Sequence, residues 1–338
     1  MDISKQNMQI PISQQYAIGI DVGGTNTKFG LVNHRGDISY HGAILTHKRE
    51  TVEGFIDELY DALMPAINDS GGLEYIRGIG IGAPNGNIYK GTIEYAPNLK
   101  WRGIIPLADL IGKKFNLSAR LTNDANAAAV GEMTYGSAKG MRDFIMITLG
   151  TGVGSGIVAN GQLIYGHDGF AGELGHTIII PEGRHHPGTG INGSLEAYAS
   201  ATGVARTALE FLDQRSKEDS LMRSYAREEI DSRVVYDCAI QGDKIALEVY
   251  EYTGRILGLA FANFVMFSSP EAIILFGGMA KAGDLLLKPT RDNMEKHLLP
   301  IFQNKVKIIF SELKEADAAI LGASALVWES RVTETATP

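Results

Sequence analysis

The chain has 338 residues, which is longer than a domain with a single hydrophobic core usually is, so we expect two domains. Its net charge of -8 disfavours nucleic acid as a partner, because phosphate backbones are bound by an excess of Lys and Arg. The single cysteine, Cys238, excludes an internal disulfide and is typical of a reducing, cytoplasmic setting. We expect no signal peptide and no membrane partner, since no apolar run approaches the roughly 20 residues needed to cross a bilayer.

Hydrophobic patterns predict an α/β first half. The first three strands form an antiparallel meander, and a glycine turn joins the first two. The predicted elements are strands at 16–21, 29–32 and 38–45, a helix at 51–67, a strand at 76–83, a polar loop, a helix at 106–115 and a strand at 119–122.

The second half begins with a repeat of the first hairpin. At an offset of about 126 positions, 20–24 aligns with 146–150 and 30–32 with 156–158. A repeat at this long period indicates a duplicated domain. The predicted elements are strands at 144–149 and 155–158, helices at 194–201 and within 204–241, a buried helix at 243–267, a strand at 272–276, a helix at 284–297, a strand at 306–311 and a helix at 316–327.

A polar stretch, Asn123-Asp124-Ala125-Asn126, lies between a predicted strand and an alanine-rich helix start. Asn and Asp are the usual helix caps and turn formers. A carboxylate in this place could also act as a base, and the local sequence leaves both interpretations open.

Two glycine turns, Gly23-Gly24-Thr25 and Gly150-Thr151-Gly152, can direct backbone N–H groups at a phosphate, although tight hairpin turns use the same residues. Neither turn matches a P-loop or a Rossmann motif. Beside the first turn, Asp21 could hold Mg²⁺ through water or form an Asx-turn. Lys28 could neutralise a phosphate or be a solvated strand residue.

Six motifs follow one another along the chain: 21–28 (DVGGTNTK), 97–101 (PNLKW), 123–128 (NDANAA), 149–154 (LGTGVG), 172–176 (GELGH) and 195–200 (LEAYAS). In this order they resemble the ROK family of sugar kinases and repressors, and its glucokinases most closely. The resemblance covers roughly residues 16–327.

The resemblance implies an α/β protein with the duplicated actin-like, hexokinase-type (ribonuclease H-like) fold, in which ATP and a sugar meet in an interlobe cleft. We expect a small lobe at 14–123 plus 316–330, a large lobe at 124–315 and a disordered tail at 331–338. A homodimer and a role in glycolysis are also expected.

By the same resemblance the chain is an ATP-dependent hexose kinase, most similar to enzymes that convert glucose to glucose 6-phosphate, with Asp124 as the general base and Mg²⁺ as a cofactor. Phosphoryl transfer needs one such group, and a polyhydroxyl substrate needs several acceptors. The residues that match sugar ligands are Asn98, Asn123, Asp124, Glu173, His176 and Glu196. The expected nucleotide contacts are Gly23, Gly24, Thr25, Lys28, Gly150, Thr151, Gly152, Gly277 and Gly278, with Asp21 at the metal.

One departure from the family pattern concerns zinc. Members usually carry Cys-Gly-Cys-Gly-x-x-Gly-Cys-x-Glu, whose thiolates bind structural zinc together with the histidine that matches His176. Here Pro187, Thr189 and Ser194 replace the three cysteines. Because the soft ligands are gone, we predict no structural zinc.

The sequence leaves the roles of three histidines and one asparagine open. His176 could be a sugar ligand, a zinc ligand or a core histidine, and His185 and His186 could either join it as substitute metal ligands or be solvated. Asn85 stands where relatives commonly have glycine in a turn beside the sugar, which bears on the choice of hexose.

The alternative functions are a kinase for another hexose or an N-acetylhexosamine, a non-catalytic sugar-binding member, and a DNA-binding repressor. We disfavour the repressor because only about 15 residues precede Tyr16, too few for a helix-turn-helix domain.

Overall fold

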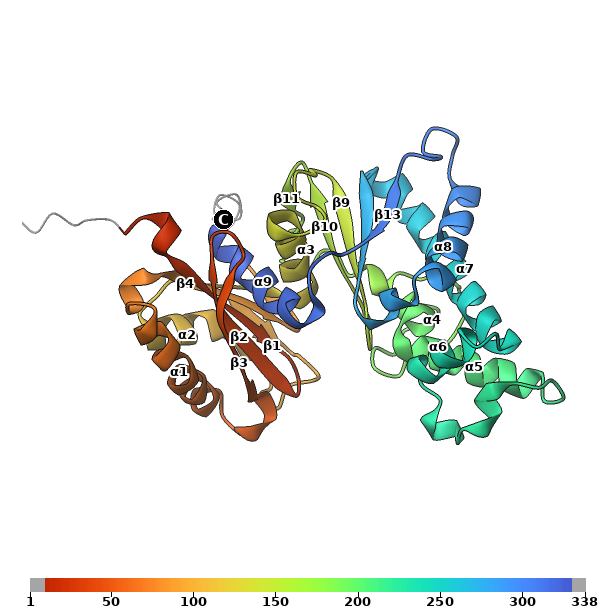
Figure 1. The fold of residues 1–338 in the computed structure, drawn as a ribbon, viewed down its shortest axis with the longest axis horizontal. Helices are drawn as coiled ribbons and strands as arrows, with labels where there is room; N and C mark the ends of the chain where they lie inside the picture. The colour runs from red at the N-terminus through yellow and green to blue at the C-terminus, as the bar shows by residue number, and fades with distance from the viewer. Residues whose placement is uncertain (1–9, 330–338) are drawn as a thin grey trace, which may run out of the picture. The chain divides into compact units, whose positions relative to one another are not determined.

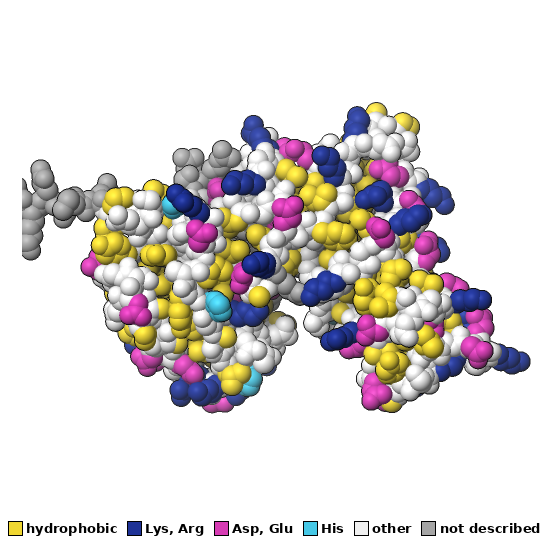
Figure 2. Space-filling model, viewed as in Figure 1, with side chains coloured by type: hydrophobic (Ala, Val, Ile, Leu, Met, Phe, Trp, Pro, Cys, Tyr) yellow, Lys and Arg dark blue, Asp and Glu magenta, His cyan; other side chains and the backbone are white. Residues whose placement is uncertain are grey.

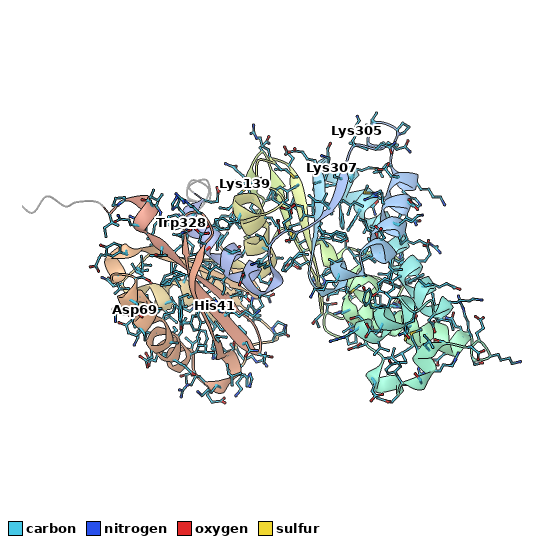
Figure 3. All side chains as sticks on the ribbon, in the orientation of Figure 1. His41, Asp69, Lys139, Lys305, Lys307 and Trp328 are labelled. Carbon is cyan, nitrogen blue, oxygen red and sulfur yellow. The ribbon has the colours of Figure 1, made fainter. Side chains whose placement is uncertain are left out.

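The computed structural model describes residues 10–329, so the tail predicted at 331–338 lies outside the described residues. The chain forms two compact units. The first unit comprises the chain up to Lys139, the segment Tyr165–Ala171 and the chain from Leu313 onward; the second comprises Gly140–Ile164 and Gly172–Glu312. Figure 3 labels Lys139 at the end of the first segment and Trp328 near the end of the last.

The first unit is built on a five-stranded sheet in the order β3-β2-β1-β4-β8 (Figure 1). The central strand β1 pairs antiparallel with β2 and parallel with β4. The strands are β1 (Tyr16–Val22), β2 (Asn26–Asn33), β3 (Ile38–Leu45), β4 (Ile76–Ala83) and β8 (Ala119–Asn123), and they confirm the predicted meander and the two later strands.

Helices α1 (Val52–Asp69) and α2 (Leu107–Phe115) pack on one face of this sheet around buried apolar side chains such as Phe55 and Leu59. Thr51 begins α1 because its side chain accepts a hydrogen bond from the Gly54 N–H. Trp101 lies in the same core, with its ring centroid 4.7 Å from that of Phe55, as expected of a packing residue.

Helix α9 (Glu315–Trp328) lies on the opposite face, against glycines of the sheet. A Cβ atom added to Gly19 or Gly80 would collide with the carbonyl oxygens of Ile320 or Ala323. The helix backbone therefore rests directly on the strands, which explains why its sequence is rich in small residues. Helix α3 (Asp124–Tyr135) packs against α9 on this side.

The polar loop predicted after β4 contains a small three-stranded sheet, which the sequence analysis missed. Its strands are β5 (Gly86–Asn87), β6 (Thr92–Glu94) and β7 (Ile104–Ile105). Strands of two or three residues are too short to show a period of two. Just before them, Asn85 adopts a left-handed conformation with φ 51°, so it takes the backbone geometry for which glycine is usually chosen.

The second unit repeats the first sheet strand for strand, in the order β11-β10-β9-β12-β13. The central strand β9 again has an antiparallel neighbour, β10, and a parallel one, β12. The strands are β9 (Phe144–Leu149), β10 (Val153–Ala159), β11 (Gln162–Leu163), β12 (Ala272–Phe276) and β13 (Lys307–Phe310). The predicted duplication is therefore confirmed.

The second unit has its core between this sheet and a group of helices, of which α7 is the longest. As predicted, α7 is buried over most of its second half. A Cβ atom on Gly254 would lie 2.5 Å from Pro289 Cγ, and one on Gly258 would lie 2.5 Å from the Thr290 carbonyl oxygen, so α8 packs closely on α7. The helices are α4 (Glu196–Ala199), α5 (Ala201–Gln214), α6 (Ser232–Ala239), α7 (Lys244–Ser268) and α8 (Asp284–His297).

The single helix predicted at 194–201 is instead two helices, α4 and the start of α5. Ser200 separates them, because it adopts an extended conformation and its hydroxyl accepts the Gly203 N–H at 3.1 Å. Short 3-10 helices complete the chain at Ile12–Gln14, Thr46–Lys48, Leu73–Tyr75, Leu174–His176, Leu221–Ser224, Arg227–Glu229 and Gly278–Ala282.

The division into units assigns residues 124–139, 165–171 and 313–315 to the first unit, whereas the predicted large lobe includes them. Helix α3 begins at residue 124 and belongs to the first unit, because it packs on α9. Within residues 10–329, no helix has the length and apolar character needed to cross a membrane. Acidic and basic side chains are mixed on the face seen in Figure 2.

Candidate active site

Adjacent strands of the first unit end side by side and carry the polar residues predicted for catalysis. Asp21 near the end of β1 pairs with Gly82 of β4, and Ala83 of β4 pairs with Asn123 of β8. These strands are parallel, so their carboxyl ends lie at one edge of the sheet, where open α/β sheets usually bind ligands.

Helix α3 begins at this edge with Asp124 as its first residue. Asn123 caps the helix: its Oδ1 accepts the N–H groups of Ala125 and Asn126 at 2.9 and 3.4 Å. One oxygen of Asp124, Oδ1, accepts the Ala125 N–H at 2.8 Å. The cap and the candidate base are thus neighbouring residues with separate roles, and both interpretations of this stretch are compatible with the geometry.

Gly82 leaves space between the two aspartates. A Cβ atom at this position would lie 3.9 Å from Asp21 Oδ1 and 3.6 Å from Asp124 Cα. A larger side chain would therefore fill the space beside both carboxylates. The sequence analysis did not single out Gly82, because its importance depends on strands that are far apart in sequence.

Besides burial, the charge of Asp124 contributes to the shifted pKa of Asp21. Burial and, to a smaller extent, the charge of Asp124 raise the pKa of Asp21 to about 6, against the opposing effect of Lys28. Lys28 acts from the position opposite Asp21 on β2. Asp124 is exposed to solvent, but the protein around its carboxylate displaces much of the water. This desolvation raises the pKa of Asp124, and the N–H groups of Ala125 and Asp124 oppose the rise.

The first glycine turn lies against Asn98. The Gly23 N–H donates to the Asn26 carbonyl at 3.0 Å and closes the hairpin. A Cβ atom on Gly24 would lie 2.9 Å from the Asn98 carbonyl oxygen, so glycine allows the predicted sugar ligand to approach the turn. Thr25 is exposed at the tip of the turn.

In the second unit, the glycine turn is in contact with Glu196. The Val153 N–H donates to Glu196 Oε2 at 2.7 Å, and a Cβ atom on Gly152 would lie 2.5 Å from the same oxygen. Gly150 and the exposed Thr151 form the rest of the turn. One predicted sugar ligand is therefore fixed by the backbone of a predicted phosphate-binding turn.

Glu173 and His176 lie at a 3-10 turn packed on β10. A Cβ atom on Gly175 would collide with the Val153 carbonyl oxygen, so the turn needs glycine there. His176 Nε2 lies 3.7 Å from Glu173 Oε2. The other ring nitrogen, Nδ1, is buried and has no hydrogen-bond partner among the described residues.

Gly278, one of the predicted nucleotide contacts, lines a cavity of about 480 Å³ in the second unit. Gly277 precedes it with φ 103°, and a Cβ atom there would lie 2.5 Å from the Leu149 carbonyl oxygen. Helix α6 supplies part of the wall, a contribution that no motif in the sequence indicated. Tyr236 of α6 is one of its lining residues.

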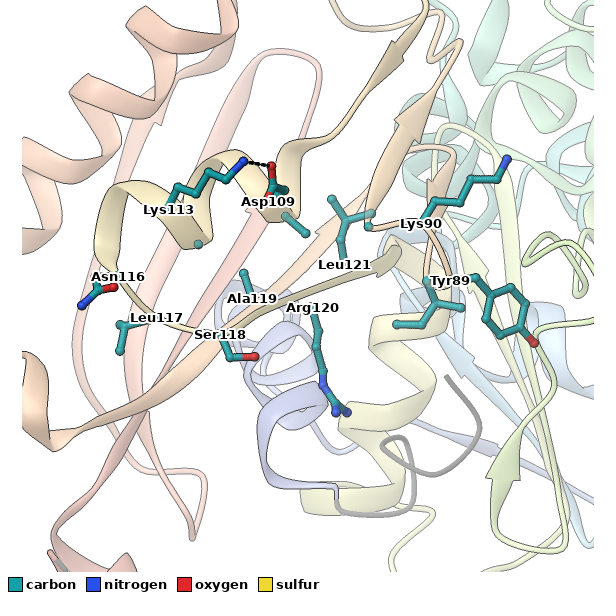
Figure 4. Close-up of a pocket in the computed structure, with 14 residues that line it drawn as sticks. Tyr89, Lys90, Asp109, Lys113, Asn116, Leu117, Ser118, Ala119, Arg120 and Leu121 are labelled. Atoms are coloured by element: carbon teal, nitrogen blue, oxygen red, sulfur yellow. Dashed lines mark hydrogen bonds and ion pairs between the residues drawn. The ribbon is translucent and has the colours of Figure 1, made fainter. Parts of the chain in front are cut away.

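A separate cavity of about 670 Å³ in the first unit contains none of the predicted site residues. It lies between α2, β8 and the segment around Tyr89 (Figure 4). Its Lys113 forms an ion pair with Asp109 at 2.6 Å, and Arg120 extends from β8 away from that pair. This cavity gives no support to the predicted chemistry.

The residues around His176 do not fit a structural zinc. Pro187 offers no ligand atom, and Thr189 contacts His186. His185 Nδ1 lies 2.9 Å from Asn192 Oδ1, and His186 pairs with Glu196. Among the described residues, no group of three or more His, Cys, Asp and Glu side chains could hold a metal ion.

The predicted site residues thus form local groups in both units. Asp21, Asn123 and Asp124 are neighbours in the first unit, and Asn98 adjoins its glycine turn. Glu196 and the second turn are neighbours in the second unit, where Gly278 lines its own cavity.

The repeated five-stranded sheet defines a two-lobed α/β protein with the duplicated actin-like, hexokinase-type fold, as solved ROK kinases also show. The model of the ROK family matches residues 17–330. The chain belongs to that family.

Named relatives include both enzymes and regulators. The chain is 37% identical to a glucokinase of Halalkalibacterium halodurans, over 94% of this chain and 96% of the relative. A ROK glucokinase from Streptomyces griseus, solved with glucose and AMPPNP, is 31% identical with a TM-score of 0.75, over 92% of this chain and 98% of that one. A xylose repressor of Caldicellulosiruptor bescii is 31% identical over 92% of this chain and 77% of the repressor.

Proposed function

We propose that this protein is an ATP-dependent hexose kinase of the glucokinase type, which transfers the γ-phosphoryl group of ATP to the 6-hydroxyl of glucose. The proposal draws on the glucokinase relatives and on the glucose and AMPPNP bound by the Streptomyces griseus enzyme. The single observation that carries it is Asp124, an accessible carboxylate on the first residue of a helix, beside the space that Gly82 leaves open.

In the proposed reaction the 6-oxygen of glucose attacks the γ-phosphorus and ADP leaves. Asp124 accepts the proton of the hydroxyl, and its raised pKa makes the carboxylate a stronger base for this role. Its rigid place at a capped helix start keeps the carboxylate oriented. Asn98, Asn123, Glu173, His176 and Glu196 would bind the other hydroxyls.

We assign the nucleotide to the glycine turns and to the cavity at Gly278. Backbone N–H groups of the two turns would bind phosphate oxygens, and the adenosine would enter the cavity beside Tyr236. Asp21 would hold Mg²⁺ through bound water, since Mg²⁺ keeps much of its hydration in proteins. Magnesium would neutralise the charge that develops on the phosphates.

A coupled assay of ADP release over a panel of hexoses and N-acetylhexosamines tests the activity. We expect glucose to give the highest kcat/KM. Asp124→Asn should lower kcat by about 10² to 10⁴, the usual contribution of a general base, while glucose binding measured by calorimetry changes little. Near-normal kcat in that variant would refute the role of Asp124.

We also propose that the protein is a homodimer formed through an exposed apolar face of the second unit. Phe267 at the end of α7 is 80% exposed and Ile178 is 50% exposed, and both line a cavity of about 310 Å³. A second copy of the chain would remove this surface from water. Light scattering should give the mass of a dimer for the natural protein and of a monomer for Phe267→Ser; a monomeric natural protein would exclude the proposal.

A further inference from the structure

The Glu196 carboxylate is held at both of its oxygens. Oε2 accepts the Val153 N–H at 2.7 Å, and Oε1 lies 3.0 Å from His186 Nε2. Both side chains are mostly buried, with Glu196 14% exposed and His186 19% exposed. Two contacts from different elements fix the carboxylate more firmly than either alone, because each restricts a different rotation of the side chain.

The hydrogen bonds of His186 determine its tautomer. The backbone N–H of Thr189 donates to His186 Nδ1 at 3.2 Å, and the Thr189 hydroxyl lies 3.1 Å from the same nitrogen. A nitrogen that accepts from an N–H group carries no hydrogen, so in the neutral ring the hydrogen is on Nε2. Nε2 then donates to the Glu196 carboxylate, and the contact does not require a charged histidine.

The loop that carries His186 is anchored at other points. The His186 N–H donates to the Ile191 carbonyl at 2.9 Å, and its own carbonyl accepts the Gly190 N–H at 2.8 Å. Two residues earlier, the Arg184 side chain is 8% exposed and donates to Thr207 Oγ1 at 2.8 Å on α5. Loss of the imidazole would therefore leave the loop attached and remove chiefly its contact with Glu196.

We propose that His186 is a positioning residue for sugar binding, which sets the orientation of Glu196 by a direct hydrogen bond. The inference rests on the proposed function, because it takes Glu196 to be a ligand of a hexose hydroxyl. In this proposal His186, whose ring is oriented by Thr189, connects its loop to Glu196, in a segment whose residues do not fit a metal site. Solvation and metal binding, the two earlier interpretations of His186, are both replaced by this one.

Steady-state kinetics with glucose and ATP as varied substrates test the inference. His186→Ala should raise the KM for glucose by about 10-fold, the usual effect of losing one hydrogen bond to a charged group. The KM for ATP and kcat should change by no more than about 3-fold, since the contact acts before the chemical step. His186→Gln should restore most of the affinity, because its amide can donate to the same carboxylate.

The matched control is His185→Ala, one residue away in the same loop. Among the described residues the His185 ring pairs with Asn192, whereas Glu196 pairs with Val153 and His186, so this variant should keep the natural KM for glucose. An equal rise of KM in the two alanine variants would overturn the inference, because it would indicate general loosening of the loop. An unchanged KM in His186→Ala would overturn it too.

A double-mutant cycle with Glu196→Gln keeps the inference falsifiable if His186→Ala folds poorly. Glucose binding to the nucleotide-free protein, measured by calorimetry, should show that the two substitutions are not additive. Additive losses would contradict a direct coupling. A natural protein that phosphorylates no hexose would instead refute the proposed function, while active natural protein with additive variants would refute only the role of His186.

Discussion

Asp21 offers the sharpest test of the proposed active site in the first unit, because its buried carboxylate should destabilise the fold. Burial and the charge of Asp124 raise its pKa from 3.8 to about 6. A raised folded-state pKa means that the stability contributed by the protonated carboxyl is fully present below about pH 3.8 and is lost as the pH rises through about 6. Asp21→Asn removes this ionisation from the folded state.

The size of the effect follows from the shift. About 2 pKa units correspond to about 3 kcal/mol of unfolding free energy, so Asp21→Asn should be more stable by up to that amount near pH 7.5. The gain should fall to about half near pH 5, where the natural carboxyl is largely protonated in the folded state. If Asp21 holds Mg²⁺ as proposed, activity should be lost over the whole range, since an amide is a poor replacement for a carboxylate beside that ion.

Urea unfolding followed by tryptophan fluorescence is the appropriate assay. Both tryptophans of the chain, Trp101 and Trp328, belong to the first unit, so the signal reports the unit that contains Asp21. Asp69→Asn is the control: its side chain is exposed at the end of α1, and a change within about 0.5 kcal/mol is expected. A loss of stability in Asp21→Asn near pH 7.5 would refute the reasoning, because it would make Asp21 a structural residue.

Three further tests address the second unit. Gly152→Ala would place a Cβ atom 2.5 Å from Glu196 Oε2 and should raise the KM for glucose by about 10-fold, because the contact between Val153 and Glu196 would be lost. The control is Gly150→Ala, whose Cβ atom would have no protein neighbour within 4 Å, so the KM for glucose should stay unchanged. Equal effects of the two variants would contradict the assignment. Tyr236→Ala should raise the KM for ATP by about 10-fold and leave the KM for glucose unaltered in the same assay, and a change confined to glucose would place the adenosine elsewhere. Elemental analysis of the purified protein should find no stoichiometric zinc, and chelation should not change its melting temperature; one zinc per chain would disprove the predicted absence.

Most of the regular structure could be predicted because its patterns are local. The repeat at an offset of about 126 positions predicted two sheets of one topology, and the spacing of Phe55 and Leu59 predicted α1. Helix α7 was recognised as buried because it is apolar nearly all round. These features depend on residues that are close in sequence, so periodicity reveals them without tertiary information.

The features that were missed depend on tertiary contacts. Gly82 matters because β1, β4 and β8 place Asp21 and Asp124 on either side of it. The contact between His186 and Glu196 joins a loop to a short helix and follows no motif. The wall that α6 adds to the cavity at Gly278 likewise arises only when distant segments pack together. The family resemblance supplied the candidate site residues but not the groups that hold them in place.

The two hairpins have the same topology but different chemistry, and one position shows why. Asp21 is the second-last residue of β1, and Thr148 is the second-last residue of β9. At the offset of 126 positions Asp21 aligns with Ile147, the residue before Thr148, and neither Ile147 nor Thr148 carries a charge. The Thr148 hydroxyl accepts the Gly154 N–H at 3.1 Å, so it completes its own hairpin and offers no charge. The strand that leads into the turn therefore supplies a carboxylate in the first copy and none in the second. The second turn instead uses a backbone N–H, that of Val153, to hold Glu196. In the proposed function the two copies therefore have different roles: the first unit supplies Asp124 and Asp21 for the proton and the metal, and the second unit orients Glu196 for the sugar.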